Sequence, residues 1–251
     1  MNIEKPASFR YKLRFLKMKI MNLRTYDQRE IHQVWEVHAL RKALDYAKVD
    51  CVFAIGANAG QYASMLRTKV GYRGRIISFE PLPHLASSIR KSSSLDPMWT
   101  VEELAVSDHD GHVEFNQMEN SEFSSILEPS TENVQLFAQM NSVKNTFSVK
   151  AETLTTAFKR LKDKHKFSTP FLKMDTQGHD LTIFRAAGDT VLEFSGLQSE
   201  LAFQSIYKKS PNAYETIAEY SSRGFTLSAL VPNNEGHFPR LIESDCIMMR
   251  L

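Results

Sequence analysis

The stretch "CVFAIGANAGQYASML", residues 51–66, joins a short apolar run to a glycine-containing bend and then to an amphipathic segment. In folds that bind a nucleotide at the edge of a parallel sheet, a buried strand is followed by a helix across such a bend. Gly56 can adopt backbone angles that are closed to other residues, and Asn58 is of a type that tolerates a positive φ. Gly60 lets the helix start close to the strand. The stretch predicts a strand, a bend and a helix, with a ligand at the bend.

The composition of the bend limits the kind of ligand. It lacks the middle glycine of a dinucleotide fingerprint, and the Asn58 side chain fills the space that a pyrophosphate needs for close approach to the backbone. This argues against NAD or FAD and favours a nucleoside without phosphates. Gln61 and Tyr62 then begin a helix whose first N–H groups face the ligand.

Glu80 strengthens the prediction of a nucleoside site. It ends the apolar run "RIISFEP" (residues 75–81), with Pro81 beside it, and follows Gly56 by 24 residues. An acid at that place can accept hydrogen bonds from both hydroxyls of a ribose. The alternative is a solvated acid at a strand end, followed by a turn proline.

A third strand end carries further polar side chains. In "FLKMDTQGHDLTIF" (residues 171–184) the apolar run ends at Asp175, with Gln177 and His179 close behind. Asp175 can bind a ligand or hold a substrate hydroxyl in the cleft, or it can simply cap the following helix. Lys173 alternates with apolar positions, so it can face outward. Glu200, in "LQSELAF", is a fourth acid at the edge and a candidate substrate-binding residue, with a structural role as its alternative.

Apolar strand-like runs alternate with helical stripes from residue 28 to the end. This alternation predicts an α/β fold, doubly wound around a mainly parallel sheet. We expect one domain over residues 28–251, preceded by a basic amphipathic arm over residues 1–27. Expected elements include helices over 28–48, 60–70 and 179–192, strands over 99–107 and 111–118, and an irregular polar segment over 119–146.

The composition is that of an ordinary globular protein, with 42% hydrophobic and 24% charged residues and a net charge of +2. Such a charge gives no general attraction to nucleic acid. The two cysteines, Cys51 and Cys246, lie in apolar runs, so we expect buried thiols and no disulfide. No apolar run is long enough to span a membrane. We expect a cytoplasmic protein whose arm packs on its own domain, contacts an anionic membrane surface or covers the partner in a homodimer.

Several of these stretches together resemble the FkbM family of S-adenosylmethionine-dependent methyltransferases, from about residue 50 to the end. They are "GANAGQYA", "SFEP", "ELAVSDHDGHVEF", "LKMDTQGHD", "LQSELAFQSIY" and "SDCIMMR". The resemblance implies a seven-stranded Rossmann-like methyltransferase sheet whose last strand is antiparallel. It also implies S-adenosylmethionine as cofactor and O-methylation of a hydroxyl on a sugar, a glycolipid or a polyketide.

The resemblance also implies roles for individual residues. Glu80 would bind the ribose, while Asp175 and Gln177 would line the cleft where methyl donor and acceptor meet. The methionine part of the cofactor would be cradled by Gly56, Asn58, Gly60 and Gln61. The adenine would lie near Ala105 and Ser107, with Asp108 next to them. Our own hypothesis, beyond the resemblance, is that Asp175 or His179 removes or steers the proton of the acceptor hydroxyl, with a surface or capping role as the alternative for His179. A divalent metal at Asp175 is the alternative, but no compact ligand spacing supports one.

Ala54 departs from the family pattern, which usually has an acid two residues before the first glycine. A carboxylate there would help to fix the ammonium group of the cofactor. A hydrogen bond to a charged group contributes about 1.5–3 kcal/mol, so its loss would weaken cofactor binding about 10- to 150-fold. The alternative function is therefore a weak or inactive methyltransferase-fold subunit that serves as a scaffold in glycan assembly. An NAD-dependent oxidoreductase is disfavoured by Asn58.

Overall fold

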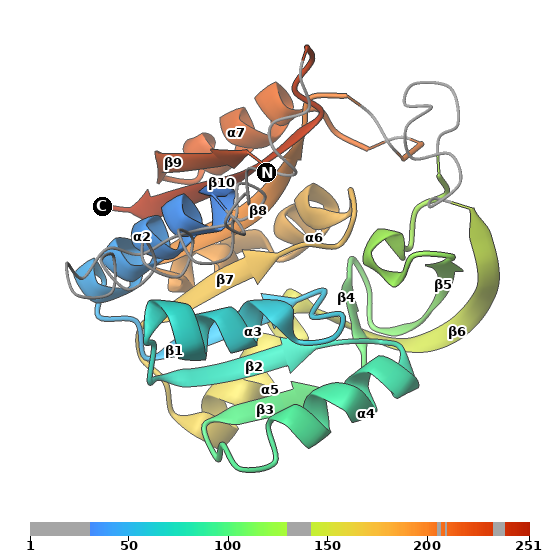
Figure 1. Ribbon diagram of the computed structural model, residues 1–251, viewed down its shortest axis with the longest axis horizontal. Coiled ribbons are helices and arrows are strands. Elements are labelled where there is room, and N and C mark those ends of the chain that lie inside the picture. Colours follow the sequence, from blue (N-terminus) through green and yellow to red (C-terminus); the bar gives the residue numbers. More distant parts are fainter. Residues whose placement is uncertain (1–30, 130–141, 205–206, 209, 233–238) are drawn as a thin grey trace, which may run out of the picture.

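The computed structural model of the protein describes residues 31–129, 142–204, 207–208, 210–232 and 239–251. At their centre lies a seven-stranded sheet (Figure 1). Its strands are, in spatial order, β3 (Trp99–Glu102), β2 (Arg75–Phe79), β1 (Cys51–Ile55), β7 (Pro170–Met174), β8 (Gly196–Ala202), β10 (Glu243–Arg250) and β9 (Phe225–Pro232). Strand β10 is antiparallel to both of its neighbours, and the other neighbouring pairs are parallel. The predicted fold class is confirmed.

Helices cover both faces of this sheet (Figure 1). On one face lie α2 (Ile31–Tyr46), α3 (Gln61–Met65) and α4 (Pro83–Ser92), and on the other lie α5 (Leu154–His165), α6 (Asp180–Ala186) and α7 (Ala213–Ser222). A π-helical turn over Leu66–Val70 extends α3, so the helix expected over 60–70 is present. All residues of β1 and β7 are buried because both faces are covered.

Helix α5 shows how the local sequence produces these elements. Thr153 precedes the helix, and its side-chain hydroxyl accepts a hydrogen bond from the backbone N–H of Thr156. The buried residues recur at helical spacing, namely Leu154, Ala157, Phe158 and Leu161. The Phe158 ring packs against Phe53 of β1, with 6.1 Å between the ring centroids. The apolar stripe of the helix thereby joins the core beneath the central strands.

A second, three-stranded sheet lies beside the carboxyl ends of the central strands (Figure 1). It consists of β4 (Ala105–Ser107), β6 (Val143–Thr153) and β5 (Gly111–Met118), in that order. The prediction of one strand over 99–107 is therefore wrong. The chain leaves the main sheet after β3, and β4 pairs with the end of β6 instead. An apolar run fits either ladder equally well, so the sequence pattern hides this change of sheet.

The helix expected over 179–192 is interrupted. Helix α6 ends at Ala186, and a 3-10 helix follows over Gly188–Glu193. Gly188 has a φ of 53°, which an α-helix cannot accommodate. The segment over 119–146, expected to be irregular, holds a short 3-10 helix, Ser121–Phe123, in its described part, and its last four residues already belong to β6.

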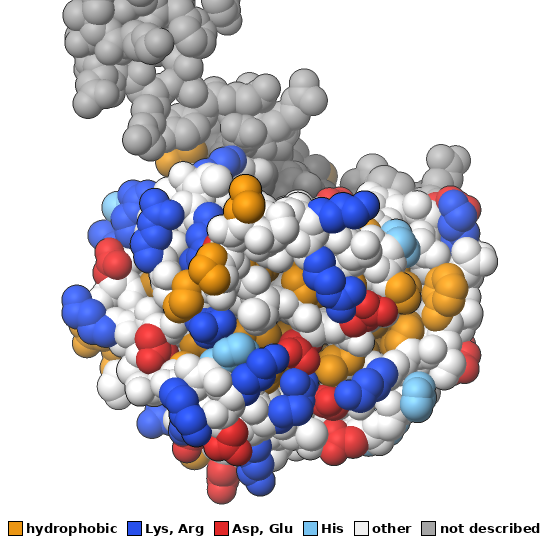
Figure 2. All heavy atoms as spheres, turned by 90° about the horizontal axis from the view of Figure 1, so that it is seen from below, with side chains coloured by type: hydrophobic (Ala, Val, Ile, Leu, Met, Phe, Trp, Pro, Cys, Tyr) orange, Lys and Arg blue, Asp and Glu red, His pale blue; other side chains and the backbone are white. Residues whose placement is uncertain are grey.

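Cys51 and Cys246 are buried free thiols, as predicted. On the face seen in Figure 2, basic and acidic side chains are interspersed over the residues that the structure describes. No helix in the described ranges has the length and apolar character needed to cross a lipid bilayer. The arm over residues 1–27 lies outside the described residues, so its separation from the domain, its membrane contact and its part in a dimer stay predictions.

Candidate functional site

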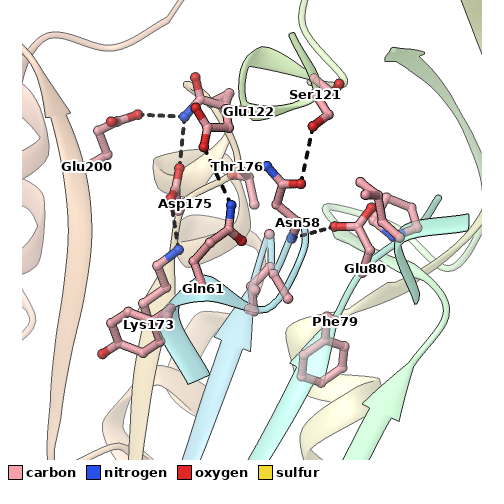
Figure 3. A pocket seen from close by; sticks show the side chains of 18 of the residues that line it. Asn58, Gln61, Phe79, Glu80, Ser121, Glu122, Lys173, Asp175, Thr176 and Glu200 are labelled. Atoms are coloured by element: carbon pink, nitrogen blue, oxygen red, sulfur yellow. Dashed lines mark hydrogen bonds and ion pairs between the residues drawn. The ribbon is translucent and has the colours of Figure 1, made fainter. Parts of the chain in front are cut away.

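A cavity of about 610 Å³ lies at the carboxyl ends of β1, β2, β7 and β8. Small-molecule sites usually have volumes of about 300–1,000 Å³. Figure 3 shows Glu80 on one side of the cavity and Asp175 and Glu200 on the other, with Asn58 and Gln61 between them. The parallel strands thus bring these strand-end residues to one place, as the sequence led us to expect.

The bend after β1 is built against the segment after β7. Gly56 has a φ of 75° and Asn58 a φ of 46°, so both adopt the left-handed conformation that the bend requires. A Cβ atom on Gly56 would lie 1.9 Å from the carbonyl oxygen of Asp175. The backbone N–H of Asp175 in turn donates to the carbonyl of Ile55 at 3.1 Å. Gly56 therefore allows the two halves of the site to approach each other closely.

Gly60 has a packing role in this structure. It has a φ of 85° and precedes α3, and a Cβ atom there would lie 3.1 Å from the ring of Trp99. Gly60 is not among the described residues that line the cavity. Its absent side chain lets the helix pack against β3, which is the close helix–strand packing that the sequence indicated.

Glu80 is a buried carboxylate that faces the cavity. Its Oε2 accepts a hydrogen bond from the backbone N–H of Asn58 at 2.8 Å, and its Oε1 accepts one from the N–H of Leu82 at 3.0 Å. Burial raises the pKa of Glu80 to about 7, although both hydrogen bonds oppose this by favouring the ionised form. Each oxygen keeps a further lone pair, so the carboxylate can accept two more donors from a ligand.

Asp175 has donors on both carboxylate oxygens. Oδ2 accepts from Lys173 Nζ at 2.9 Å, and Oδ1 accepts from Gln177 Nε2 at 2.8 Å. The same Gln177 amide donates to Glu200 Oε2 at 3.0 Å. Burial would lower the pKa of Lys173, but the Asp175 carboxylate outweighs this effect and raises it. Lys173 is thus a buried ammonium group over the ring of Tyr62, and the alternative that it faces outward is wrong.

The side of the cavity around Asp175 is acidic. Four other carboxylates that line it are Glu36 of α2, Glu200 of β8, and Glu243 and Asp245 of β10. Burial raises the pKa of Glu200 and Asp245 well above the usual range, and that of Glu243 to about 7. The opposite side, near Glu80, is lined mainly by apolar residues, which include Pro81, Leu82, Leu85, Leu104, Ala105, Val106 and Phe115.

Residues 121–127, here called the covering segment, close the cavity between its two sides. Ser121 Oγ donates to the Asn58 side chain at 3.3 Å (Figure 3). Ser125 Oγ is buried and lies 3.2 and 2.9 Å from the carbonyl oxygens of Thr176 and Gln177. The covering segment therefore contacts both the bend after β1 and the residues after β7. Its polar sequence gave no indication of these contacts.

Besides Gly60 and Ala54, three predicted site residues do not line the cavity. Ser107, Asp108 and His179 are not among the lining residues in the described part of the chain. His179 is buried at the start of α6, where its Nε2 lies 3.2 Å from Ser107 Oγ, and Ser107 Oγ donates to Asp108 Oδ1 at 3.1 Å. Gln177 and Gly178 have φ angles of 54° and 91°, which turn the chain between Asp175 and His179. The structure thus does not bring these three residues to the cavity with Glu80 and Asp175, and their roles stay predictions.

Ala54 is 1% exposed and is not one of the described residues that line the cavity. The strand register places it directly beside Lys173 on one side and Ser78 on the other. The ammonium group of Lys173, rather than a carboxylate, therefore reaches the cavity from this level of the sheet.

The sequence matches the methyltransferase FkbM domain over residues 54–227, which is more than half of the chain. The chain belongs to the FkbM methyltransferase family. The FkbM resemblance is thereby confirmed, and with it the methyltransferase activity and the S-adenosylmethionine cofactor that the resemblance implied.

Solved structures with a similar fold include the N-methyltransferase NodS from Bradyrhizobium japonicum, with 12% identity over 90% of this chain and 99% of that chain and a TM-score of 0.47. Aeropyrum pernix fibrillarin, solved with natively bound S-adenosyl-L-methionine, has 11% identity over 80% of this chain and 66% of that chain and a TM-score of 0.42. These likenesses concern the fold alone. The comparison with curated proteins gives no match.

Within the described ranges of this FkbM methyltransferase, no three His, Cys, Asp or Glu side chains are arranged so that they could hold a metal ion. Asp175, the predicted alternative metal ligand, instead has an ammonium group and an amide group on its two oxygens. Because hydrogen-bond donors already contact both oxygens of Asp175, this carboxylate suits a ligand that donates a further hydrogen bond to it.

Proposed function

We propose that this methyltransferase transfers the methyl group of S-adenosylmethionine to a hydroxyl group of a small-molecule acceptor, such as a sugar, a glycolipid or a polyketide-like compound. The observation that carries the proposal is that one cavity holds Glu80 on one side and Asp175 on the other. The first residue suits the ribose of the cofactor, and the second suits a hydroxyl group.

The residues of the cavity fit the cofactor. The two free lone pairs of the Glu80 carboxylate match the paired hydroxyls of a ribose, and the backbone N–H groups of Asn58 and Leu82 hold that carboxylate in place. The apolar side beyond Glu80, which includes Leu85, Leu104 and Phe115, suits an adenine ring. The bend at Gly56 and Asn58 and the first residue of α3, Gln61, then lie toward the methionine part.

When bound, S-adenosylmethionine supplies a methyl group on a sulfonium, a leaving group that needs no acid. The protein has to align the acceptor with it, and good alignment of two reactants contributes about 7–11 kcal/mol to lowering a barrier. Asp175 orients the acceptor hydroxyl by accepting its hydrogen bond and takes up its proton. Lys173 and Gln177 act as positioning residues, because their hydrogen bonds fix the Asp175 carboxylate.

Asp175→Asn is expected to lower kcat about 10²- to 10⁴-fold, the usual contribution of a positioned acid or base. Binding of S-adenosylmethionine, followed by calorimetry, should change only a few-fold. The acceptor would first be found by screening sugars and polyketide alcohols for a methyl gain by mass spectrometry. Full turnover by Asp175→Asn with that acceptor would refute the role of this carboxylate.

A variant with the same change of charge at a distant place provides the control. Asp189 is an exposed residue of the 3-10 helix after α6, where it pairs with Arg223. Asp189→Asn should leave both kcat and cofactor binding unchanged, which separates a loss of function at Asp175 from a general effect of removing an acid.

Ala54→Asp is expected to strengthen binding of S-adenosylmethionine at least about tenfold, the lower end of the contribution of a hydrogen bond to a charged group. The new carboxylate would stand beside Lys173, which compensates its charge in the buried position. Calorimetric titration would measure the change, and Ala54→Asn, of the same size but neutral, is the control. Equal affinities of Ala54→Asp and the unaltered protein would show that the cofactor does not use this position.

A further inference from the structure

Two polar atoms on the acidic side of the cavity are buried without a partner. Gln198 of β8 is 1% exposed, and its Nε2 donates to Glu36 Oε1 at 2.9 Å and to Asp245 Oδ2 at 3.0 Å. Its Oε1 has no hydrogen-bond partner among the described residues, and the same holds for the hydroxyl of Tyr62. Both residues line the cavity. Because buried polar atoms nearly always have a partner, these two indicate that a ligand group belongs here.

The chemistry of the lining favours a positively charged hydrogen-bond donor. The Gln198 oxygen is an acceptor. Burial raises the pKa of Glu243 and Asp245, so a cation bound beside them would favour their ionised form, which is also acceptor-only. Five acids line this side, namely Glu36, Asp175, Glu200, Glu243 and Asp245. The lysines among the described residues that line the cavity are Lys173, which pairs with Asp175, and Lys69, which donates to Gln33. Burying ionised carboxylates without enough positive charge nearby costs free energy, and a bound cation would lower that cost.

A metal ion does not fit this requirement. No three acidic, histidine or cysteine side chains of the described ranges converge closely enough to ligate one ion. An ammonium group needs no such convergence, because its three N–H bonds can point to separate acceptors.

The strands that carry Gln198, Glu243 and Asp245 lie far across the sheet from the strand that precedes the predicted ribose site. Glu80 follows β2, whereas Gln198 lies on β8 and Glu243 and Asp245 lie on β10, three and four strands further across the sheet. At about 4.8 Å between strands these separations are about 14 and 19 Å. Eight bonds of about 1.5 Å, from a ribose hydroxyl to the amino nitrogen, reach at most about 10 Å when extended. The main chain of β10 thus starts beyond this length from β2, which favours the acceptor as the source of a cation near Glu243 and Asp245.

We propose that the acidic side of the cavity is a subsite for a protonated amino group of the acceptor, held by Gln198, Glu243 and Asp245. The acceptor would then be a compound that carries both hydroxyl groups and a charged amine, such as an amino sugar. This inference rests on the proposed function, because it assumes that the acceptor shares the cavity with the cofactor.

Paired probes of the same skeleton test the subsite. Kanamycin carries charged amines and hydroxyls on a sugar framework, and its fully N-acetylated form keeps the framework but lacks the charge. Calorimetry at neutral pH, with the intact protein saturated with S-adenosylhomocysteine, should show at least about tenfold tighter binding of kanamycin, as expected for a hydrogen bond to a charged group. Asp245→Asn should reduce this preference to less than about threefold, and Glu243→Gln, as a second variant, should do the same.

Asp189→Asn, which removes an exposed acid far from the cavity, should keep the full preference. Equal binding of the two probes would overturn the subsite, and so would binding of neither probe by protein that still binds S-adenosylhomocysteine. A preference that survives in both Asp245→Asn and Glu243→Gln would also overturn it. Failure to bind S-adenosylhomocysteine would instead contradict the proposed function, so the two failures can be told apart.

Discussion

Gly56→Ala should destabilise the protein by more than about 3 kcal/mol and abolish cofactor binding, because it combines strain with a direct clash. The added Cβ atom would lie 1.9 Å from the Asp175 carbonyl oxygen, a distance that no side-chain movement can relieve because the clashing atom belongs to the backbone. The segments after β1 and β7 would have to separate, and the hydrogen bond from the Asp175 N–H to the Ile55 carbonyl would be lost with them. Denaturant unfolding and calorimetric titration with S-adenosylmethionine measure the two effects.

Gly188→Ala is the matched control for this substitution. Gly188 also has a positive φ, 53°, but nothing lies within 4 Å of the position of its Cβ atom. It should therefore show only the cost of a left-handed conformation, about 1–2 kcal/mol, with unchanged cofactor affinity. If both variants lost the same stability and both still bound the cofactor, the close approach of Gly56 to Asp175 would not be what holds the site together.

The convergence of Gly56, Glu80 and Asp175 could be predicted from the sequence because one rule of geometry governs it. Each residue ends or follows an apolar run, and the carboxyl ends of parallel strands meet at one edge of a sheet. The period of the apolar residues and the alternation of strands with helices along the chain suffice for such a prediction. Neither requires knowledge of side-chain contacts. The main sheet and its antiparallel last strand could be predicted for the same reason, together with the family resemblance.

The contacts around these residues could not be predicted in the same way. They depend on the backbone angles of the loops and on side-chain orientations, which the pattern of apolar and polar residues does not contain. His179 follows Asp175 by four residues, yet the left-handed angles at Gln177 and Gly178 turn it toward Ser107. The covering segment is polar and irregular, so nothing in its sequence shows that Ser125 is buried against the Gln177 carbonyl.

Lys173 shows a further limit of sequence patterns. A lysine in an apolar strand usually faces solvent, and only the register with Ala54 and the nearby Asp175 shows that this one is buried and paired. The small side chain of Ala54 and the buried ammonium group of Lys173 belong to one arrangement. The departure of Ala54 from the family pattern is therefore understood only together with its neighbour.

Glu80→Gln should weaken binding of S-adenosylmethionine about 10²- to 10⁴-fold, since two hydrogen bonds to a charged group contribute about 1.5–3 kcal/mol each. The amide would lose the charge, and its NH₂ group would face one of the two backbone N–H groups, of Asn58 or Leu82, that now donate to the carboxylate. Calorimetry at pH 8, where Glu80 is ionised in the unaltered protein, measures the full effect.

The pH dependence of binding provides an independent test of Glu80. Its pKa of about 7 lies above the ordinary value, so the group is protonated below pH 7 in the free protein and must lose a proton to accept both ribose hydroxyls. Affinity should therefore be constant above about pH 8 and fall about tenfold per pH unit below pH 7.

Glu243 also has a pKa of about 7, so the variants have to separate the two carboxylates. The dependence should vanish in Glu80→Gln and persist in Glu243→Gln, because only the first residue lies on the side of the cavity that suits the ribose. The reverse result would place the titrating group on β10 and the ribose elsewhere.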